Sequence, residues 1–253
     1  MNFLPMRERD PGTMRHSATR RRFLKKTAAV GAGLAMLGAV PPDALAADHA
    51  VSGPCHESVR DIVDTALTAE LLAVTFYYAG LTTHSIAGDA GPHDARKLSF
   101  LRATLDQEHQ HAQIWRGRGA SSPHRHFYFP TSSFERLGFT NQPGTYLWTL
   151  DHLETTFAGI YLAALRRFSA LGHQDLAMLA VRVLGVECRH RALYRVISQD
   201  DPADNITLEV DEFPCVHDGA QVLAPFLTGH GFPYGTTHMV HLPTSQQVAR
   251  AIA

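Results

Sequence analysis

The sequence predicts an all-α protein: a four-helix bundle made of two antiparallel hairpins joined by one long crossover, followed by a short, partly helical C-terminal tail. Four long segments repeat apolar residues every three or four positions, the spacing of one helix face. Short turns join the first two and the last two segments, whereas about 25 residues separate the two pairs. Short turns favour antiparallel neighbours, and the long connection is able to run the length of a bundle.

The four predicted helices span Glu57 to His84, Pro92 to Arg118, Pro143 to Ala170 and His173 to Gln199. The turn AGDAG closes the first hairpin, and LGH closes the second. At ~3.3 Å per extended residue the crossover reaches about 80 Å, twice the ~40 Å length of such a helix. In the tail we expect a short helix at Asp218–Leu227 and a terminal helix that begins at Thr244 or Ser245, both packed on the outside of the bundle.

The N-terminus has the pattern of a cleaved export signal. A basic stretch, Thr19 to Lys26, precedes an apolar run of 14 residues, Thr27 to Val40, and a small-x-small end at Ala44–Ala46. The run is shorter than the roughly 20 residues that span a bilayer. Thr19 to Lys25 resembles the twin-arginine signal, Ser/Thr-Arg-Arg-x-Phe-Leu-Lys, at every position. This resemblance implies export of an already folded bacterial protein to the periplasm or beyond, with an ordinary secretory signal as the alternative.

The predicted domains are a signal peptide at residues 1–46, the helical bundle at 47–200 and a C-terminal extension at 201–253. The signal carries eight basic and three acidic residues, so its removal takes the formal net charge from −1 to −6. A negative mature chain argues against a nucleic-acid partner, and we expect no membrane association after cleavage. The oligomeric state stays open, a homodimer included.

Each apolar stripe carries one glutamate near its middle, and two stripes add a histidine three residues later. Positions i and i+3 share a helix face, so each Glu-x-x-His pair points to one side. Unpaired carboxylates are costly in an apolar core, and no Lys or Arg lies on these stripes nearby. Two divalent cations would neutralise four carboxylates, and oxygen ligands with two imidazoles suit iron or manganese. The candidate metal ligands are Glu70, Glu108, His111, Glu154, Glu187 and His190.

The two halves of the bundle repeat the same pattern. ELLAVTFYYAGL from Glu70 matches ETTFAGIYLAAL from Glu154, and LDQEHQHAQIWR from Leu105 matches LGVECRHRALYR from Leu184. An internal duplication explains why the same ligand types occur twice. His109 lies about 100° round the helix from its neighbour Glu108, so we expect it to face outward or sideways.

This pattern resembles the ferritin-like di-iron/di-manganese carboxylate superfamily, in which a Glu from each of two helices joins a Glu-x-x-His from each of the other two. The match covers about Glu57 to Gln199, and exported bacterial ferritin-like domain proteins are the most similar members. The resemblance implies two iron ions, or alternatively two manganese ions. Either the glutamates of the Glu-x-x-His pairs or the two single glutamates would bridge them.

The same resemblance implies redox chemistry towards Fe(II), O₂ or peroxide, as in a ferroxidase- or peroxidase-like oxidoreductase. A di-manganese catalase-like enzyme and a non-enzymatic metal-binding or stress-protective protein are the alternatives. The chain lacks a C-x-x-C pair and therefore the rubredoxin-type electron-transfer module of rubrerythrin. The long crossover and the tail argue against a mineral-storage cage.

Other chemically active residues have two interpretations each. Buried aromatic residues on the inward stripes fill the core or hydrogen-bond the site, and two histidine-rich stretches are surface features or a second metal site. A Cys55–Cys215 disulfide would require the segment from Gln199 to run back nearly extended, and Cys188 is a packing residue. The aromatic residues and histidines concerned are Tyr77, Trp115, Tyr161, Tyr194, His124, His126, His238 and His241.

Overall fold

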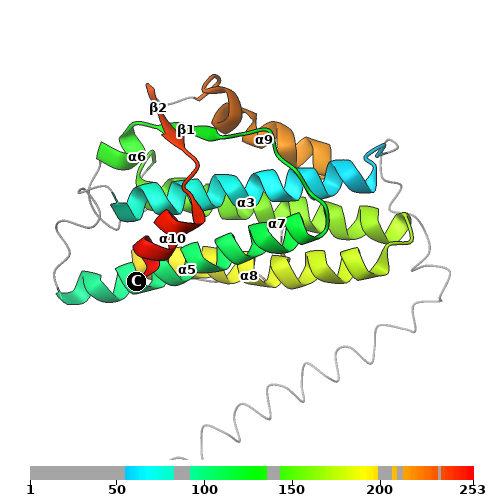
Figure 1. Ribbon diagram of the computed structural model, residues 1–253, viewed down its shortest axis with the longest axis horizontal. Helices are drawn as coiled ribbons and strands as arrows, with labels where there is room; N and C mark the ends of the chain where they lie inside the picture. The colour runs from blue at the N-terminus through cyan, green and yellow to red at the C-terminus, as the bar shows by residue number, and fades with distance from the viewer. Residues whose placement is uncertain (1–54, 83–91, 136–142, 199–206, 210–212, 233–234) are drawn as a thin grey trace, which may run out of the picture. The chain divides into compact units, whose positions relative to one another are not determined.

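Four long helices form the bundle in the computed structural model, which describes residues 55–82, 92–135, 143–198, 207–209, 213–232 and 235–253. These helices are α3 (Val59–Thr82), α5 (Pro92–Gly117), α7 (Tyr146–Ala170) and α8 (Gln174–Ser198). α3 packs against α5, and α7 packs against α8 (Figure 1). The predicted all-α bundle is confirmed, and every bundle helix ends within three residues of its expected bounds.

All described residues belong to one compact unit, Val51–Ala253. The predicted signal peptide at residues 1–46 and the AGDAG turn lie outside the described residues.

Local hydrogen bonds set the ends of the bundle helices. The Ser58 hydroxyl accepts the Asp61 N–H at 3.2 Å, and the Asp61 carboxylate accepts the Ser58 N–H at 2.9 Å, so α3 starts with a reciprocal cap. The Thr145 hydroxyl accepts the Trp148 N–H at 3.4 Å at the start of α7. Gly172, with φ of 79°, makes the tight turn from α7 into α8.

The crossover contains secondary structure that the sequence analysis did not anticipate. Strand β1 (His126–Pro130) and the short helix α6 (Ser132–Glu135) interrupt its extended path. β1 pairs in antiparallel register with β2 (Thr237–His241), which lies in the C-terminal tail. Phe127 and Phe129 of β1 are fully buried, so the two-stranded sheet is held to the bundle by its apolar face.

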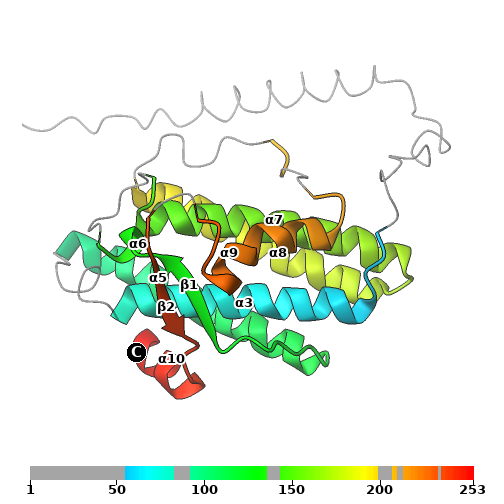
Figure 2. The same ribbon diagram turned by 90° about the horizontal axis from the view of Figure 1, so that it is seen from above.

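The C-terminal tail covers the outside of the bundle, as expected. Helix α9 (Val216–Thr228) packs on α7 and α3, and helix α10 (Ser245–Ile252) packs on α5 (Figures 1 and 2). α10 begins after Thr244, whose hydroxyl accepts the Gln247 N–H at 3.3 Å, while Gln247 Oε1 accepts the Thr244 N–H at 2.8 Å.

A disulfide joins the tail to the start of the bundle. Cys55, just before α3, is bonded to Cys215, just before α9, with the two Cα atoms 5.6 Å apart. This pairing was one of the possibilities that the sequence left open. The bond links positions 160 residues apart.

Helix α3 is the most apolar element of the bundle. Its length and composition match those of a membrane-spanning helix, yet 78% of its most apolar window is buried inside the protein. The neighbouring bundle helices and α9 account for that burial, because they pack on it from several sides. Its apolar character is therefore that of a core helix.

Close packing on α3 leads to a stability prediction at Gly80. A methyl group there would overlap the buried ring of Tyr146. Gly80→Ala is therefore expected to destabilise the fold by about 1–3 kcal/mol, as overpacking does in other cores. Chemical unfolding monitored by circular dichroism measures this change. The matched control is Gly185→Ala in α8, where a methyl group meets no atom within 4 Å, and a gain of up to ~1 kcal/mol is expected. An equal effect of both substitutions would contradict the packing argument.

Candidate metal centre

The structure brings all six predicted ligands together in the middle of the bundle. Each of the four helices contributes at least one of them, because the apolar stripe that carries them faces the bundle axis. None of the six is more than 7% exposed. They are Glu70 from α3, Glu108 and His111 from α5, Glu154 from α7, and Glu187 and His190 from α8.

Each histidine is surrounded by three carboxylates. His111 Nδ1 lies 3.4 Å from Glu70 Oε2, 3.6 Å from Glu108 Oε2 and 3.1 Å from Glu187 Oε1. One carboxylate in each trio comes from the histidine's own helix, three residues earlier, and the other two come from neighbouring helices. This half of the centre therefore draws on α3, α5 and α8.

The second half repeats the arrangement around His190. Its Nδ1 lies 2.7 Å from Glu108 Oε1, 3.6 Å from Glu154 Oε2 and 3.5 Å from Glu187 Oε2. This half draws on α5, α7 and α8. The two imidazole rings have centroids 6.5 Å apart, which leaves a separate space in front of each ring.

The donor atoms form two overlapping groups of four. In each group, one donor atom from every residue lies within 4.8 Å of the others. Glu70 and His111 belong only to the first group, and Glu154 and His190 only to the second. Glu108 and Glu187 belong to both. Glu108 and Glu187 are therefore the two residues that both groups share.

These residues fit a pair of metal ions because their inward atoms have no hydrogen-bond partner among the described residues. Buried polar atoms of this kind are costly unless something else satisfies them. The donor set of six carboxylate oxygens and two imidazole nitrogens matches the preference of hard to borderline divalent cations. The atoms are Glu70 Oε2, both oxygens of Glu108 and of Glu187, Glu154 Oε2, His111 Nδ1 and His190 Nδ1.

Charge inside the cluster is divided between its members. Burial raises the pKa values of the single glutamates Glu70 and Glu154 well above the usual range, and the shared glutamates add to the effect by repulsion. Burial also acts to raise the pKa values of the shared pair, but contacts with both imidazoles bring those values below normal. Burial acts to lower the pKa values of the two histidines, and the facing carboxylates more than reverse it. We therefore expect the metal-free cluster to hold two carboxylates, two imidazoliums and two neutral carboxylic acids.

Two tyrosines fix the outer oxygens of the single glutamates. The Tyr161 hydroxyl, on α7, donates to Glu70 Oε1, and Trp115 Nε1 in turn donates to Tyr161 Oη at 2.8 Å. In the other half, the Tyr77 hydroxyl, on α3, donates to Glu154 Oε1 at 2.7 Å. Each tyrosine thus crosses to the opposite hairpin and leaves the second oxygen of its glutamate directed at the centre. These aromatic residues both fill the core and hydrogen-bond the site.

Sequence reasoning missed Gln107, which lies beside the ligand Glu108. Its Oε1 accepts the Nε2–H of His190 at 2.7 Å. That bond leaves Nδ1, the nitrogen facing the carboxylates, free to bind metal when the ring is neutral. Nothing in the stretch LDQEHQH distinguishes this glutamine from the exposed Gln110, because only packing brings α8 next to it.

A polar contact beside the centre also escaped prediction. Arg191 donates two hydrogen bonds to Glu209, and the Cys188 thiol lies 3.2 Å from the same carboxylate. Burial, followed by the nearby Glu209 charge, raises the pKa of Cys188 to about 12. Cys188 is half-buried and its thiol donates a hydrogen bond to Glu209, so its predicted role as a buried packing residue was incomplete.

The other singled-out histidines lie away from the centre. His109 turns outward, as expected, and its Nε2 lies 3.2 Å from Ser245 Oγ of α10. His126 and His241 face each other across the two-stranded sheet, whereas His238 is paired with Phe129 and makes an edge-on ring contact with Phe134. His126 and His241 therefore form a pair across the sheet, whereas His238 packs against aromatic residues instead.

Comparison with known proteins agrees with this architecture. A family model described as "Ferritin-like domain" matches residues 58–200, which is more than half of the chain and contains all six residues of the centre. Comparisons with curated proteins and with solved structures gave no match. The matched range begins with α3 and ends just after α8, so it coincides with the four helices that build the centre. The chain belongs to the family of ferritin-like domain proteins.

Proposed function

We propose that this protein is an exported oxidoreductase whose dinuclear centre acts on Fe(II), O₂ or peroxide. The observation that carries the proposal is the double site: two groups of four donors share Glu108 and Glu187. Glu108 and Glu187 would contribute to holding both ions, Glu70 and His111 would hold one of them, and Glu154 and His190 would hold the other. Two iron(II) ions would supply one electron each, as reduction of O₂ to peroxide or of peroxide to water requires.

The residues around the centre support this chemistry by holding the ligands in place. Tyr161 and Tyr77 each occupy one oxygen of a single glutamate, so only the other oxygen is available to a metal. Gln107 sets the tautomer of His190. Each single glutamate belongs to one donor group only, so it would hold one ion and not both.

A stopped-flow experiment tests the redox activity. Metal-free protein is loaded with two equivalents of Fe(II) without oxygen and is then mixed with O₂ or with hydrogen peroxide. We expect Fe(II) oxidation that is at least about tenfold faster than with Glu187→Ala, because loss of a shared ligand disrupts both positions. Equal rates in the two proteins would contradict the proposal.

Two alternative functions predict different results in these assays with O₂ and hydrogen peroxide. A di-manganese catalase-like enzyme would be isolated with manganese and would release O₂ from peroxide. A non-enzymatic metal-binding protein would hold its metals with no turnover in either assay. Metal analysis of protein purified after native export therefore precedes the kinetics. N-terminal sequencing of that material checks the proposed twin-arginine export, for which a mature chain beginning at Ala47 is expected.

A further inference from the structure

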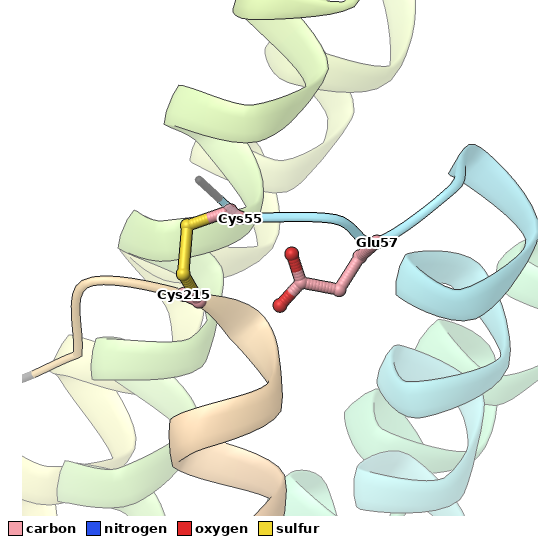
Figure 3. A group of neighbouring side chains, drawn as sticks. All are labelled: Cys55, Glu57 and Cys215. Carbon is pink, nitrogen blue, oxygen red and sulfur yellow. A yellow bond between two sulfur atoms is a disulfide. The ribbon is translucent and has the colours of Figure 1, made fainter. Parts of the chain in front are cut away.

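A second set of metal-binding residue types lies far along α3 from the dinuclear centre, where the start of α3 meets the start of α9. Cys55 and Cys215 form the disulfide there, and the carboxylate of Glu57 is directed at the two sulfur atoms (Figure 3). One donor atom from each of these residues lies within 4.8 Å of the others. Two chain segments that are 160 residues apart in sequence therefore present two sulfurs and a carboxylate to one point.

Only one oxygen of the Glu57 carboxylate has a hydrogen-bond partner in the disulfide form. Its Oε1 accepts the backbone N–H of His217 at 2.8 Å. Its Oε2 is buried and has no hydrogen-bond partner among the described residues. Because a disulfide carries no proton to donate, it cannot satisfy that oxygen. A buried carboxylate oxygen without a partner is unfavourable, and a cation in front of it would satisfy it.

The surroundings suit a metal ion that binds sulfur. An open cavity of about 470 Å³ adjoins the cysteines, and His56 and His217 line it together with Glu57. Cys215 is the residue before the first turn of the 13-residue helix α9, a position that stabilises a thiolate. Thiolates and a carboxylate are ligand types that zinc takes in proteins, as are imidazoles such as those that line this cavity.

We propose that reduction of the Cys55–Cys215 disulfide converts this corner into a site for a thiophilic divalent cation such as Zn²⁺, with Cys55, Cys215 and Glu57 as ligands. A dithiol supplies two electrons and two protons, which break the S–S bond and give two thiols, while the dithiol becomes a disulfide. Binding of the divalent ion then releases both thiol protons. Disulfide and metal are thus alternative links between the start of α3 and the start of α9.

Cobalt titration of the full chain tests the proposal. Metal-free protein is reduced with a phosphine, which is oxidised to its oxide and does not chelate metals as a dithiol does, and Co²⁺ is added under argon. We expect a thiolate-to-cobalt charge-transfer band in the reduced protein and none in the oxidised protein. The dinuclear centre contributes no such band, because its ligands are carboxylates and imidazoles. Zn²⁺ should displace the signal.

Three variants make the assignment specific. The band should disappear in the double variant Cys55→Ser/Cys215→Ser and persist in Cys188→Ser, which removes the remaining cysteine. Glu57→Gln should weaken Co²⁺ binding by at least about tenfold. Asp61→Asn, which changes another carboxylate lining the same cavity, is the matched control and should have little effect.

Folding is followed in parallel by circular dichroism. If reduction alone unfolds the chain, Co²⁺ has to restore both the helical signal and the band. Absence of the band after reduction, or its survival in the double variant, would overturn the site. Unchanged Co²⁺ affinity in Glu57→Gln would remove Glu57 from it. These results do not depend on whether the dinuclear centre is redox-active.

Discussion

Glu187→Ala is expected to empty both metal positions, whereas Glu70→Ala is expected to empty one. Glu187 lies in both groups of donors, with one oxygen in contact with His111 and the other with His190. Its removal takes one of the two shared carboxylates from both positions at once. Glu70 lies in the first group only, so its loss leaves the second group complete. The expected metal content is therefore two per chain in the wild type, one in Glu70→Ala and none in Glu187→Ala.

Elemental analysis of the purified variants gives this stoichiometry, and calorimetric titration of Fe(II) or Mn(II) gives the affinities. His109→Ala is the control, because His109 lies on the same helix as a ligand pair yet faces α10. It should retain two ions. Retention of two ions by Glu187→Ala would show that the shared carboxylate is not a ligand. Circular dichroism confirms that each variant is folded.

The second large effect is a pH dependence that metal binding removes. In the metal-free protein, both histidines and the single glutamates have pKa values raised above their ordinary values of 6.5 and 4.5. Above pH 6.5 the unfolded chain has released these protons while the folded chain still holds them. Stability from a raised pKa is complete below the unfolded value and declines as pH rises towards the folded value. The single glutamates should therefore cost the metal-free protein stability from about pH 4.5 upward, and the two histidines add to that loss from about pH 6.5 upward.

The size and the sign of the effect follow from the number of protons. Each proton held only by the folded state lowers the free energy of unfolding by up to ~1.4 kcal/mol per pH unit. The shared pair, Glu108 and Glu187, has lowered pKa values, so it is ionised in both states above pH 4.5 and adds no slope in this range. In the metal-loaded protein the ligands are already deprotonated, so its stability should be nearly constant over the same interval.

Thermal unfolding between pH 6.5 and 9, with and without bound metal, measures the difference. The gap between the two midpoints should widen as pH rises. The double variant Glu70→Gln/Glu154→Gln replaces two titrating acids by neutral amides, so its metal-free protein should show a shallower decline. A metal-free wild type whose midpoint rises with pH would contradict the charge distribution that we assign to the cluster.

The sequence by itself determined the bundle and its six inward ligand candidates. Periodicity of three and four is a local property: once a segment is helical, residues such as Glu108 and His111 must share a face. Burial then requires that face to point inward, because the stripe is otherwise apolar. The internal duplication showed that the two halves of the bundle carry the same residues at matching positions. The two Glu-x-x-His pairs and the two single glutamates were therefore found without any contact being known.

Only the tertiary structure decided how distant segments meet. The pairing of β1 with β2 depends on strands more than a hundred residues apart, and neither has a sequence pattern that identifies its partner. Glu108 and Glu187 became the shared pair through the rotation of α5 and α8 about their axes, which packing sets and helical spacing leaves free. Gln107 and the Cys55–Cys215–Glu57 corner arise in the same way. A local pattern specifies which face of an element is buried, whereas long-range packing specifies which atoms meet there.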